Sequence, residues 1–85
     1  MQQEFLPREV ASDVPRMTLT GGERLFVEQH KGLLDCREEL ISLKTASGIL
    51  CVEGCHLMLL RYSRVEALIT GDIRSLSLQP DGRRS

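Results

Sequence analysis

The strongest constraint on the fold of this chain is a succession of short apolar runs, each ended by a glycine or a charged turn. Apolar and polar residues alternate within many of these runs, and this period of two is typical of β-strands, whereas helical spacing is hard to find. The sequence therefore predicts an all-β domain of about seven to eight short antiparallel strands. The expected strands are Arg16–Thr20, Arg24–Gln29, Leu33–Arg37, Leu40–Lys44, Ile49–Glu53, Leu57–Tyr62, Ala67–Thr70 and Ile73–Leu78.

Glycines stand where most of these runs end. Glycine adopts positive φ without a steric cost, so it marks the expected turns between strands. Three of these residues, Gly32, Gly54 and Gly71, are predicted to be structural turn positions, at which valine would cost folding rather than a specific activity. The predicted turns are Gly21-Gly22, Lys31-Gly32, Ser47-Gly48, Gly54 and Gly71-Asp72.

Hairpin pairing of successive runs keeps apolar residues on one face of the sheet. Turns near Glu38-Glu39 and Ala46-Ser47 bring Ile41 opposite both Cys36 and Val52, and Leu43 opposite Leu50. A slip of one residue would turn every side chain over, so this agreement supports the register. The same scheme pairs Leu34 with Leu43, Val27 with Cys36, Val52 with Leu57 and Leu50 with Leu59. The predicted apolar layer is Leu25, Val27, Leu34, Cys36, Ile41, Leu43, Leu50, Val52, Leu57 and Leu59.

The opposite face becomes apolar towards the later strands, where Ile49, Cys51, Met58, Leu60 and Tyr62 gather. If this face of the sheet were exposed to solvent, its residues would be polar. We therefore expect other residues to cover the face over the later strands. One alternative is cover by the chain's own last strands, with Leu68, Ile69, Ile73, Leu76 and Leu78. This gives a small β-sandwich of immunoglobulin-like, two-layer architecture. The other is cover by a partner, for which Ile49, Met58, Leu60 and Tyr62 are the predicted interaction surface.

The chain of 85 residues has the length of one domain. We expect a lead-in segment over residues 1–15, a β domain over residues 16–79 and a flexible tail over residues 80–85. A domain this small buries little apolar surface, so its free energy of unfolding is expected to be small. Association into a homo-oligomer would bury more surface and stabilise the fold.

The charges nearly cancel, with 11 Lys and Arg against 12 Asp and Glu. This balance lacks the broad positive field of a nucleic-acid or acidic-lipid binder, and we expect no nucleic-acid partner. No apolar run reaches the roughly 20 residues of a transmembrane helix, and the N-terminus does not resemble a secretory signal. We therefore expect a cytoplasmic protein with reduced thiols.

A metal or redox module built on Cys51, Cys55 and His56 is one alternative to a binding domain. The spacing of the two cysteines fits a zinc site, but an extended strand would hold them roughly 13 Å apart, so small buried hydrophobes are the preferred interpretation. His30 and His56 stand at turns with no recognisable nucleophile beside them, and we expect them to be exposed and idle. No phosphate-binding glycine motif occurs. The prediction is therefore a non-enzymatic protein without catalytic residues, cofactor or metal.

A small-ligand or nucleic-acid-binding regulatory β domain is the second alternative. The candidate residues for its binding site are Arg61, Arg64 and Arg74. Ligand binding that weakens steeply with added salt would identify such a domain. Glu66 and Asp72 interrupt this set, so ordinary surface charge is preferred.

Open strand edges are a further means of association, because their N–H and C=O groups are unpaired. In the first expected strand, Arg16–Thr20, only the polar side chains of Arg16, Thr18 and Thr20 would oppose pairing with another chain. Edge pairing is therefore one candidate mode of assembly.

Several segments of the chain stand in a specific order and spacing: Leu6–Val10, Val14–Gly21, Val27–Leu34, Glu39–Ile41, Ser47–Gly54, Leu57 and Thr70–Ile73. Together they resemble the YqfC branch of the YabP/YqfC family of sporulation proteins. The resemblance covers nearly the whole chain, from about Leu6 to Leu78, and has three departures. Gln29 stands where the family tends to have Asn, Cys36 where an aromatic residue is common, and His56 where a smaller polar residue is usual.

The resemblance implies a small β-sandwich protein, not known as an enzyme, made in the mother cell of an endospore-forming bacterium. It further implies an adaptor or scaffold role in development of the spore envelope, in the coat or cortex. The implied partner is a membrane-associated sporulation protein, which would place this chain at the periphery of the forespore envelope.

Overall fold

The computed structural model describes residues 13–81, and within them the chain forms six strands and no helix. The all-β, antiparallel prediction is confirmed. The strands are β1 (Arg16–Thr20), β2 (Arg24–Glu28), β3 (Gly32–Cys36), β4 (Leu40–Thr45), β5 (Gly48–Tyr62) and β6 (Glu66–Gln79). Residues 1–12 and 82–85 lie outside the described part, so most of the predicted lead-in and tail do too.

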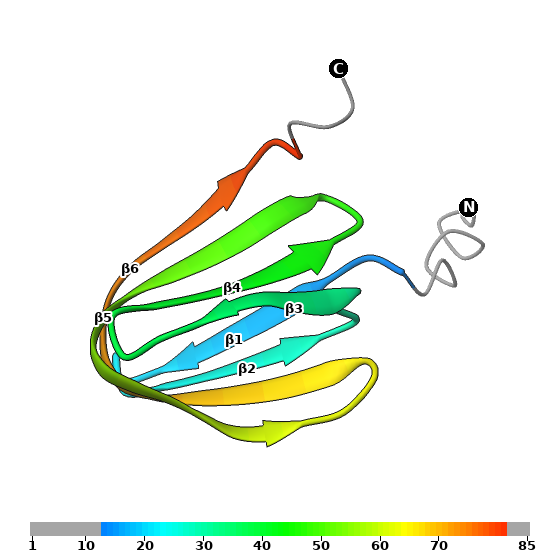
Figure 1. Ribbon diagram of the computed structural model, residues 1–85. Coiled ribbons are helices and arrows are strands. Elements are labelled where there is room, and N and C mark those ends of the chain that lie inside the picture. Colours follow the sequence, from blue (N-terminus) through cyan, green and yellow to red (C-terminus); the bar gives the residue numbers. More distant parts are fainter. Residues whose placement is uncertain (1–12, 82–85) are drawn as a thin grey trace, which may run out of the picture.

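All six strands belong to a single hydrogen-bonded sheet with the order β1-β2-β6-β5-β4-β3. Two separate sheets were expected for an immunoglobulin-like sandwich. Instead, the sheet bends across its long central hairpin, so that its two halves splay apart from a common edge (Figure 1). β2 pairs with the first part of β6, and β4 pairs with the first part of β5. Each half is therefore built around a different part of the same hairpin.

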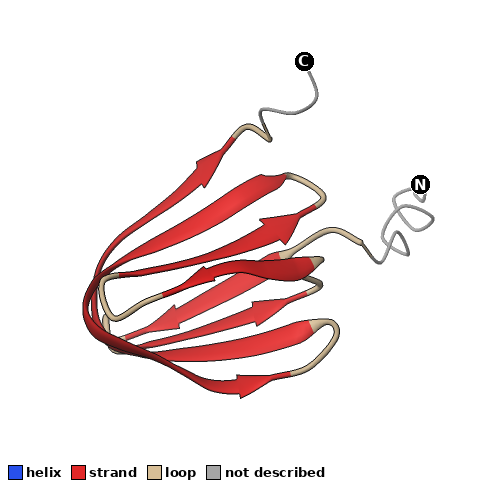
Figure 2. Cartoon of the chain, viewed as in Figure 1, coloured by secondary structure: helices blue, strands red, loops and turns tan. Residues whose placement is uncertain are grey.

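The prediction of seven to eight strands was wrong because β5 and β6 are each one long strand. The runs Ile49–Glu53 and Leu57–Tyr62 join into β5, and the last two expected strands join into β6 (Figure 2). Gly54 and Gly71 do not end their strands. The pairing of β5 with β6 instead shifts register between Glu53 and Gly54 and between Cys55 and Met58. Such irregularities bend a strand without breaking it.

The bend depends on close backbone approach at two glycines. A Cβ atom on Gly54 would overlap the carbonyl group of Asp72. At Gly71 it would meet the His56 carbonyl oxygen at 2.6 Å, and Gly71 also has a φ of 135°, which favours glycine. Because neither glycine has a Cβ atom, the backbones of β5 and β6 can approach each other closely at the bend.

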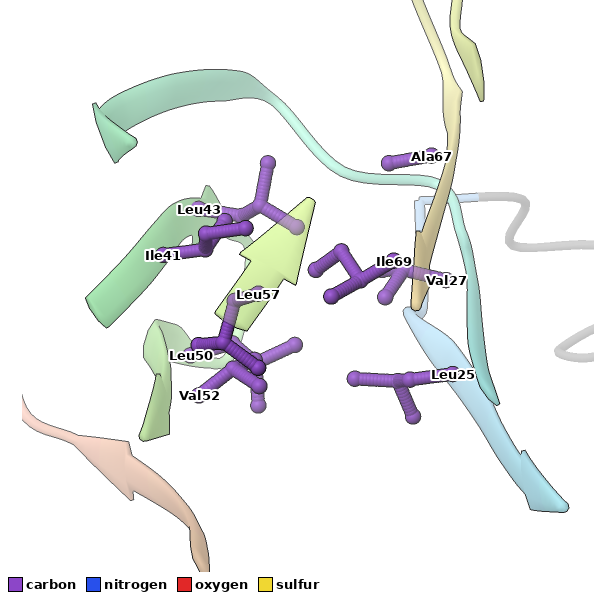
Figure 3. Close-up of a cluster of buried hydrophobic side chains, with 9 residues drawn as sticks. All are labelled: Leu25, Val27, Ile41, Leu43, Leu50, Val52, Leu57, Ala67 and Ile69. Atoms are coloured by element: carbon purple, nitrogen blue, oxygen red, sulfur yellow. The ribbon is translucent and has the colours of Figure 1, made fainter. Parts of the chain in front are cut away.

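The core lies between the two halves of the bent sheet, and side chains from both halves point toward one another there (Figure 3). Full burial of one such Leu or Ile side chain contributes about 1.5–3 kcal/mol. Most residues of the predicted apolar layer are buried in this core, so that part of the prediction is confirmed. The core also contains Ala67 and Ile69, which the predicted layer did not include. The buried residues are Leu25, Val27, Ile41, Leu43, Leu50, Val52, Leu57, Ala67 and Ile69.

Pairing of Ile41 with Cys36 and Val52, and of Leu43 with Leu50, is confirmed. Other predicted pairs were wrong: Leu43 lies opposite Leu33, because a bulge between Leu33 and Asp35 shifts β3 by one residue. This bulge leaves Leu34 54% exposed, and Cys36 is also exposed, so neither belongs to the core. Pairing of Val52 with Leu57 and of Leu50 with Leu59 is excluded because all four lie on β5, and Val27 pairs with Met17 and Ala67 rather than with Cys36.

Candidate interaction surfaces

The outer face of one half of the sheet carries an apolar patch. Phe26 on β2 lies opposite Leu68 on β6, and the strand alternation that buries Leu25 and Val27 directs Phe26 to the other face. Phe26 and Leu68 are half-buried. Further along the same face, Met58 of β5 lies opposite Thr70 of β6 and is 57% exposed.

Leu60 joins this patch through an irregularity in β5. The register with β6 shifts between Leu59 and Arg61, so an extra residue stands against Leu68. Leu59 packs against the core, which leaves Leu60 directed outward and 51% exposed. We call Phe26, Met58, Leu60 and Leu68 the outer patch.

The predicted interaction residues do not form one surface. Ile49 lies at the start of β5, where it pairs with Lys44 and Gln79, whereas Met58, Leu60 and Tyr62 lie beyond the bend. Met58 and Leu60 belong to the outer patch. Sequence reasoning missed Phe26 and assigned Leu68 to cover, although the alternation of β2 and β6 would have placed both on the outer face.

Tyr62 has a different neighbour, the imidazole ring of His30. The ring centroids are 5.0 Å apart and the planes are inclined by 24°. His30 was expected to be exposed at a turn, but it is only 3% exposed, so that expectation was wrong. The ring is buried because its connection between β2 and β3 crosses from one half of the sheet to the other.

Both ring nitrogens of His30 have partners. The N–H of Gly32 donates to Nδ1 at 2.9 Å, so the hydrogen of the neutral ring resides on Nε2, which donates to the Ser63 carbonyl oxygen at 2.8 Å. The N–H groups of Gln29 and His30 also donate to the Val65 carbonyl oxygen, at 2.6 and 3.1 Å. The β2–β3 connection is thus fastened to the β5–β6 turn.

Beside this contact lies a cavity of about 250 Å³ on the β2–β6–β5 side of the molecule. Arg61 is part of its lining, whereas Arg74 lies on the second half of β6, beyond the bend. The cavity is lined by Phe26, Arg61, Tyr62, Ser63, Glu66, Ala67 and Leu68.

Arg74 is engaged by a carboxylate. Its Nη2 and Nε atoms donate to Oδ2 of Asp72 at 2.7 and 3.1 Å. These hydrogen bonds, and then the charge of the guanidinium, hold the pKa of Asp72 below its usual range, and the same contact raises the pKa of Arg74. The three arginines considered as a ligand site do not converge, because Arg61 lies near the end of β5 and Arg64 in the β5–β6 turn, whereas Arg74 lies beyond the bend.

The cysteines are free thiols at separate places on the sheet. Cys51 lies opposite Ser77, and Cys55 lies opposite Asp72 near the bend. Over residues 13–81, no group of three or more His, Cys, Asp and Glu side chains is placed to hold a metal ion. The same residues include no helix long and apolar enough to cross a membrane.

Comparison with known proteins gives two agreeing matches. Uncharacterized protein YqfC of Bacillus subtilis (strain 168) is 29% identical over 68 residues, which cover 80% of this chain and 73% of that protein. No solved structure matches significantly. The model of the YabP family matches residues 12–85, and therefore includes all six strands. The chain belongs to the YabP family, as the resemblance to YabP/YqfC proteins had indicated.

Proposed function

We propose that this chain is a non-enzymatic sporulation protein that acts as a protein-interaction adaptor or scaffold in development of the spore envelope. The observation that supports this role most directly is the outer patch, where Met58 and Leu60 are more than half exposed beside Phe26 and Leu68. Apolar patches with polar surroundings are common contact surfaces between proteins. The proposed partner is a membrane-associated sporulation protein.

In this proposal the chain works in the cytoplasm of the mother cell and lies at the periphery of the forespore envelope. Family membership supports the link to sporulation. The outer patch supplies the contact, and the buried core between the two halves holds it in place.

The test is replacement of the gene in an endospore-forming host by a variant that carries Met58→Lys and Leu60→Lys. We expect the double variant to fold with an unchanged melting temperature, because both side chains are exposed, and to lower the yield of heat-resistant spores. The matched control is Leu34→Lys, a leucine of similar exposure on the other half of the sheet. Normal spore yield from the folded double variant would contradict the proposed surface.

The cavity beside Tyr62 supports a second candidate, a regulatory domain that binds a small ligand. Arg61 supplies a positive charge there, and Phe26 an apolar wall. This candidate requires that Arg61→Gln abolish binding of an anionic ligand, and that added salt weaken the same binding.

A further inference from the structure

Among the described residues 13–81, β1 forms one end of the sheet, and no other strand pairs with its outer edge. All five of its residues are exposed, and it pairs with β2 from Arg16 to Thr20 without a bulge. At the other end of the sheet, β3 is interrupted by the bulge between Leu33 and Asp35. Bulges protect an edge from pairing, whereas a regular, exposed edge is a template for another strand.

The backbone groups of β1 that point away from β2 belong to Met17 and Leu19. The N–H of Glu23 donates to the Thr20 carbonyl oxygen at 3.1 Å, so the backbone groups of Thr20 face β2. In an antiparallel ladder alternate residues direct these groups to the same side. Those of Thr18 and Arg16 therefore also face β2, and those of Met17 and Leu19 face outward.

The side chains of Met17 and Leu19 continue the core layer to this edge. Met17 lies opposite Val27 and Leu19 opposite Leu25, both fully buried, yet Met17 is 36% and Leu19 47% exposed. Within the part of the chain that the structure describes, the apolar layer thus ends at the same two residues whose N–H and C=O groups have no strand partner.

We propose that two copies of this chain associate by antiparallel pairing of β1 with β1 about a two-fold axis at Thr18. In this register Met17 lies opposite the partner's Leu19, and the two exchange both backbone hydrogen bonds, as do Leu19 and the partner's Met17. The apolar layers of the two copies meet. Arg16 lies opposite the partner's Thr20, so no like charges face each other.

The neighbouring registers are less favourable. Pairing centred on Met17 sets Leu19 against the partner's Pro15, which has no N–H to donate. Pairing centred on Leu19 sets Met17 against the partner's Gly21, which lies in the β1–β2 turn with a φ of 60°. The register about Thr18 is the one that satisfies both free residues. Its short ladder is a small interface, so we expect a dimer that dissociates at roughly micromolar concentration.

The register predicts a specific rescue between two variants. Met17→Lys and Leu19→Glu each place a charge against an apolar residue in a self-pair, and each is expected to weaken self-association at least about tenfold. An equimolar mixture sets the new ammonium opposite the new carboxylate and Leu19 opposite Met17, so it should form heterodimers. Light scattering coupled to size exclusion measures the masses. The control Leu34→Lys, on β3, should leave the dimer intact, as should Met58→Lys in the outer patch.

A cross-link tests the axis directly. Opposed residues without mutual hydrogen bonds have Cα atoms about 4.5 Å apart, within disulfide range. In a Cys36→Ser background, which removes the exposed native thiol, Thr18→Cys should give a disulfide-linked dimer under mild oxidation. Arg16→Cys should not, because the two copies of residue 16 lie roughly 14 Å apart along the ladder.

A wild-type chain that stays monomeric at about 100 µM overturns the proposal. So does a dimer that persists in Met17→Lys or is lost in Leu34→Lys, and so does equal cross-linking at positions 16 and 18. The inference stands apart from the sporulation role: loss of partner binding through the outer patch leaves β1 pairing unchanged, and loss of β1 pairing leaves the outer patch intact.

Discussion

Tyr62 stacks on His30, with the two ring centroids 5.0 Å apart. The next residue, Ser63, lies 33 positions after His30 in the sequence, and its carbonyl oxygen is hydrogen-bonded to the same imidazole ring. His30 belongs to the connection that crosses from one half of the sheet to the other, and Tyr62 ends β5. The stack and the two ring hydrogen bonds therefore close the bent sheet on the side away from the glycines of the bend.

Removal of the His30 ring should destabilise the fold. His30→Ala leaves the Gly32 N–H and the Ser63 carbonyl oxygen without their ring partners, and it removes the stacked face of Tyr62. We expect a loss of about 2–3 kcal/mol in the free energy of unfolding, measured by urea denaturation. Tyr62→Phe keeps the stack and is the control. An equal loss in both variants would contradict the role given to the ring.

Gln29 has a φ of 64°, a conformation that strains most side chains. Asn and Gly adopt it more readily, because Asn tolerates the left-handed region and Gly has no Cβ. Gln29→Asn should stabilise the protein by about 0.5 kcal/mol and Gln29→Gly by about 0.5–1 kcal/mol. Glu28→Gly, within β2, should destabilise it. Thermal melts measure all three, and a lower melting temperature for Gln29→Gly than for wild type would contradict the prediction.

The three glycines predicted to be structural differ in what surrounds them. Gly54→Ala and Gly71→Ala should each cost more than about 2 kcal/mol, because a Cβ would meet backbone atoms across the bend. Gly32 has a φ of 145° but open space around its Cα, so Gly32→Ala should cost only about 1 kcal/mol, from backbone strain. Chemical denaturation measures the free energy of unfolding of the three variants. A larger loss for Gly32→Ala than for Gly54→Ala would contradict the proposed importance of close backbone contact at the bend.

The pair of Asp72 and Arg74 predicts a small dependence of stability on pH. The folded state lowers the pKa of Asp72, so the pair stabilises the fold above the pKa that Asp72 has in the unfolded chain. This contribution is lost as the pH falls through the lower, folded pKa. Arg74→Gln should therefore lower the melting temperature slightly at neutral pH and not in strong acid. Because both side chains are exposed, salt should reduce the difference. A difference that grows in acid would contradict the sign.

Pairing between neighbours in the sequence was the most predictable part of the fold. The pairing of β4 with β5, and of Cys36 with Ile41, depends on the alternation of apolar residues and on short turns. The outer patch was predictable in part for the same reason, since Met58 and Leu60 stand out of phase with the buried residues.

The alternation of apolar and polar residues was enough to predict an all-β chain, most of the apolar layer and the register of β4 with β5, because each of these depends on near neighbours along the chain. Three features were visible only in the folded chain: β6 lies between β2 and β5, the β5–β6 hairpin bends at Gly54 and Gly71 instead of ending there, and His30 is buried. These features depend on contacts between distant segments, where the burial of two apolar layers against each other outweighs the local tendency of glycine to end a strand.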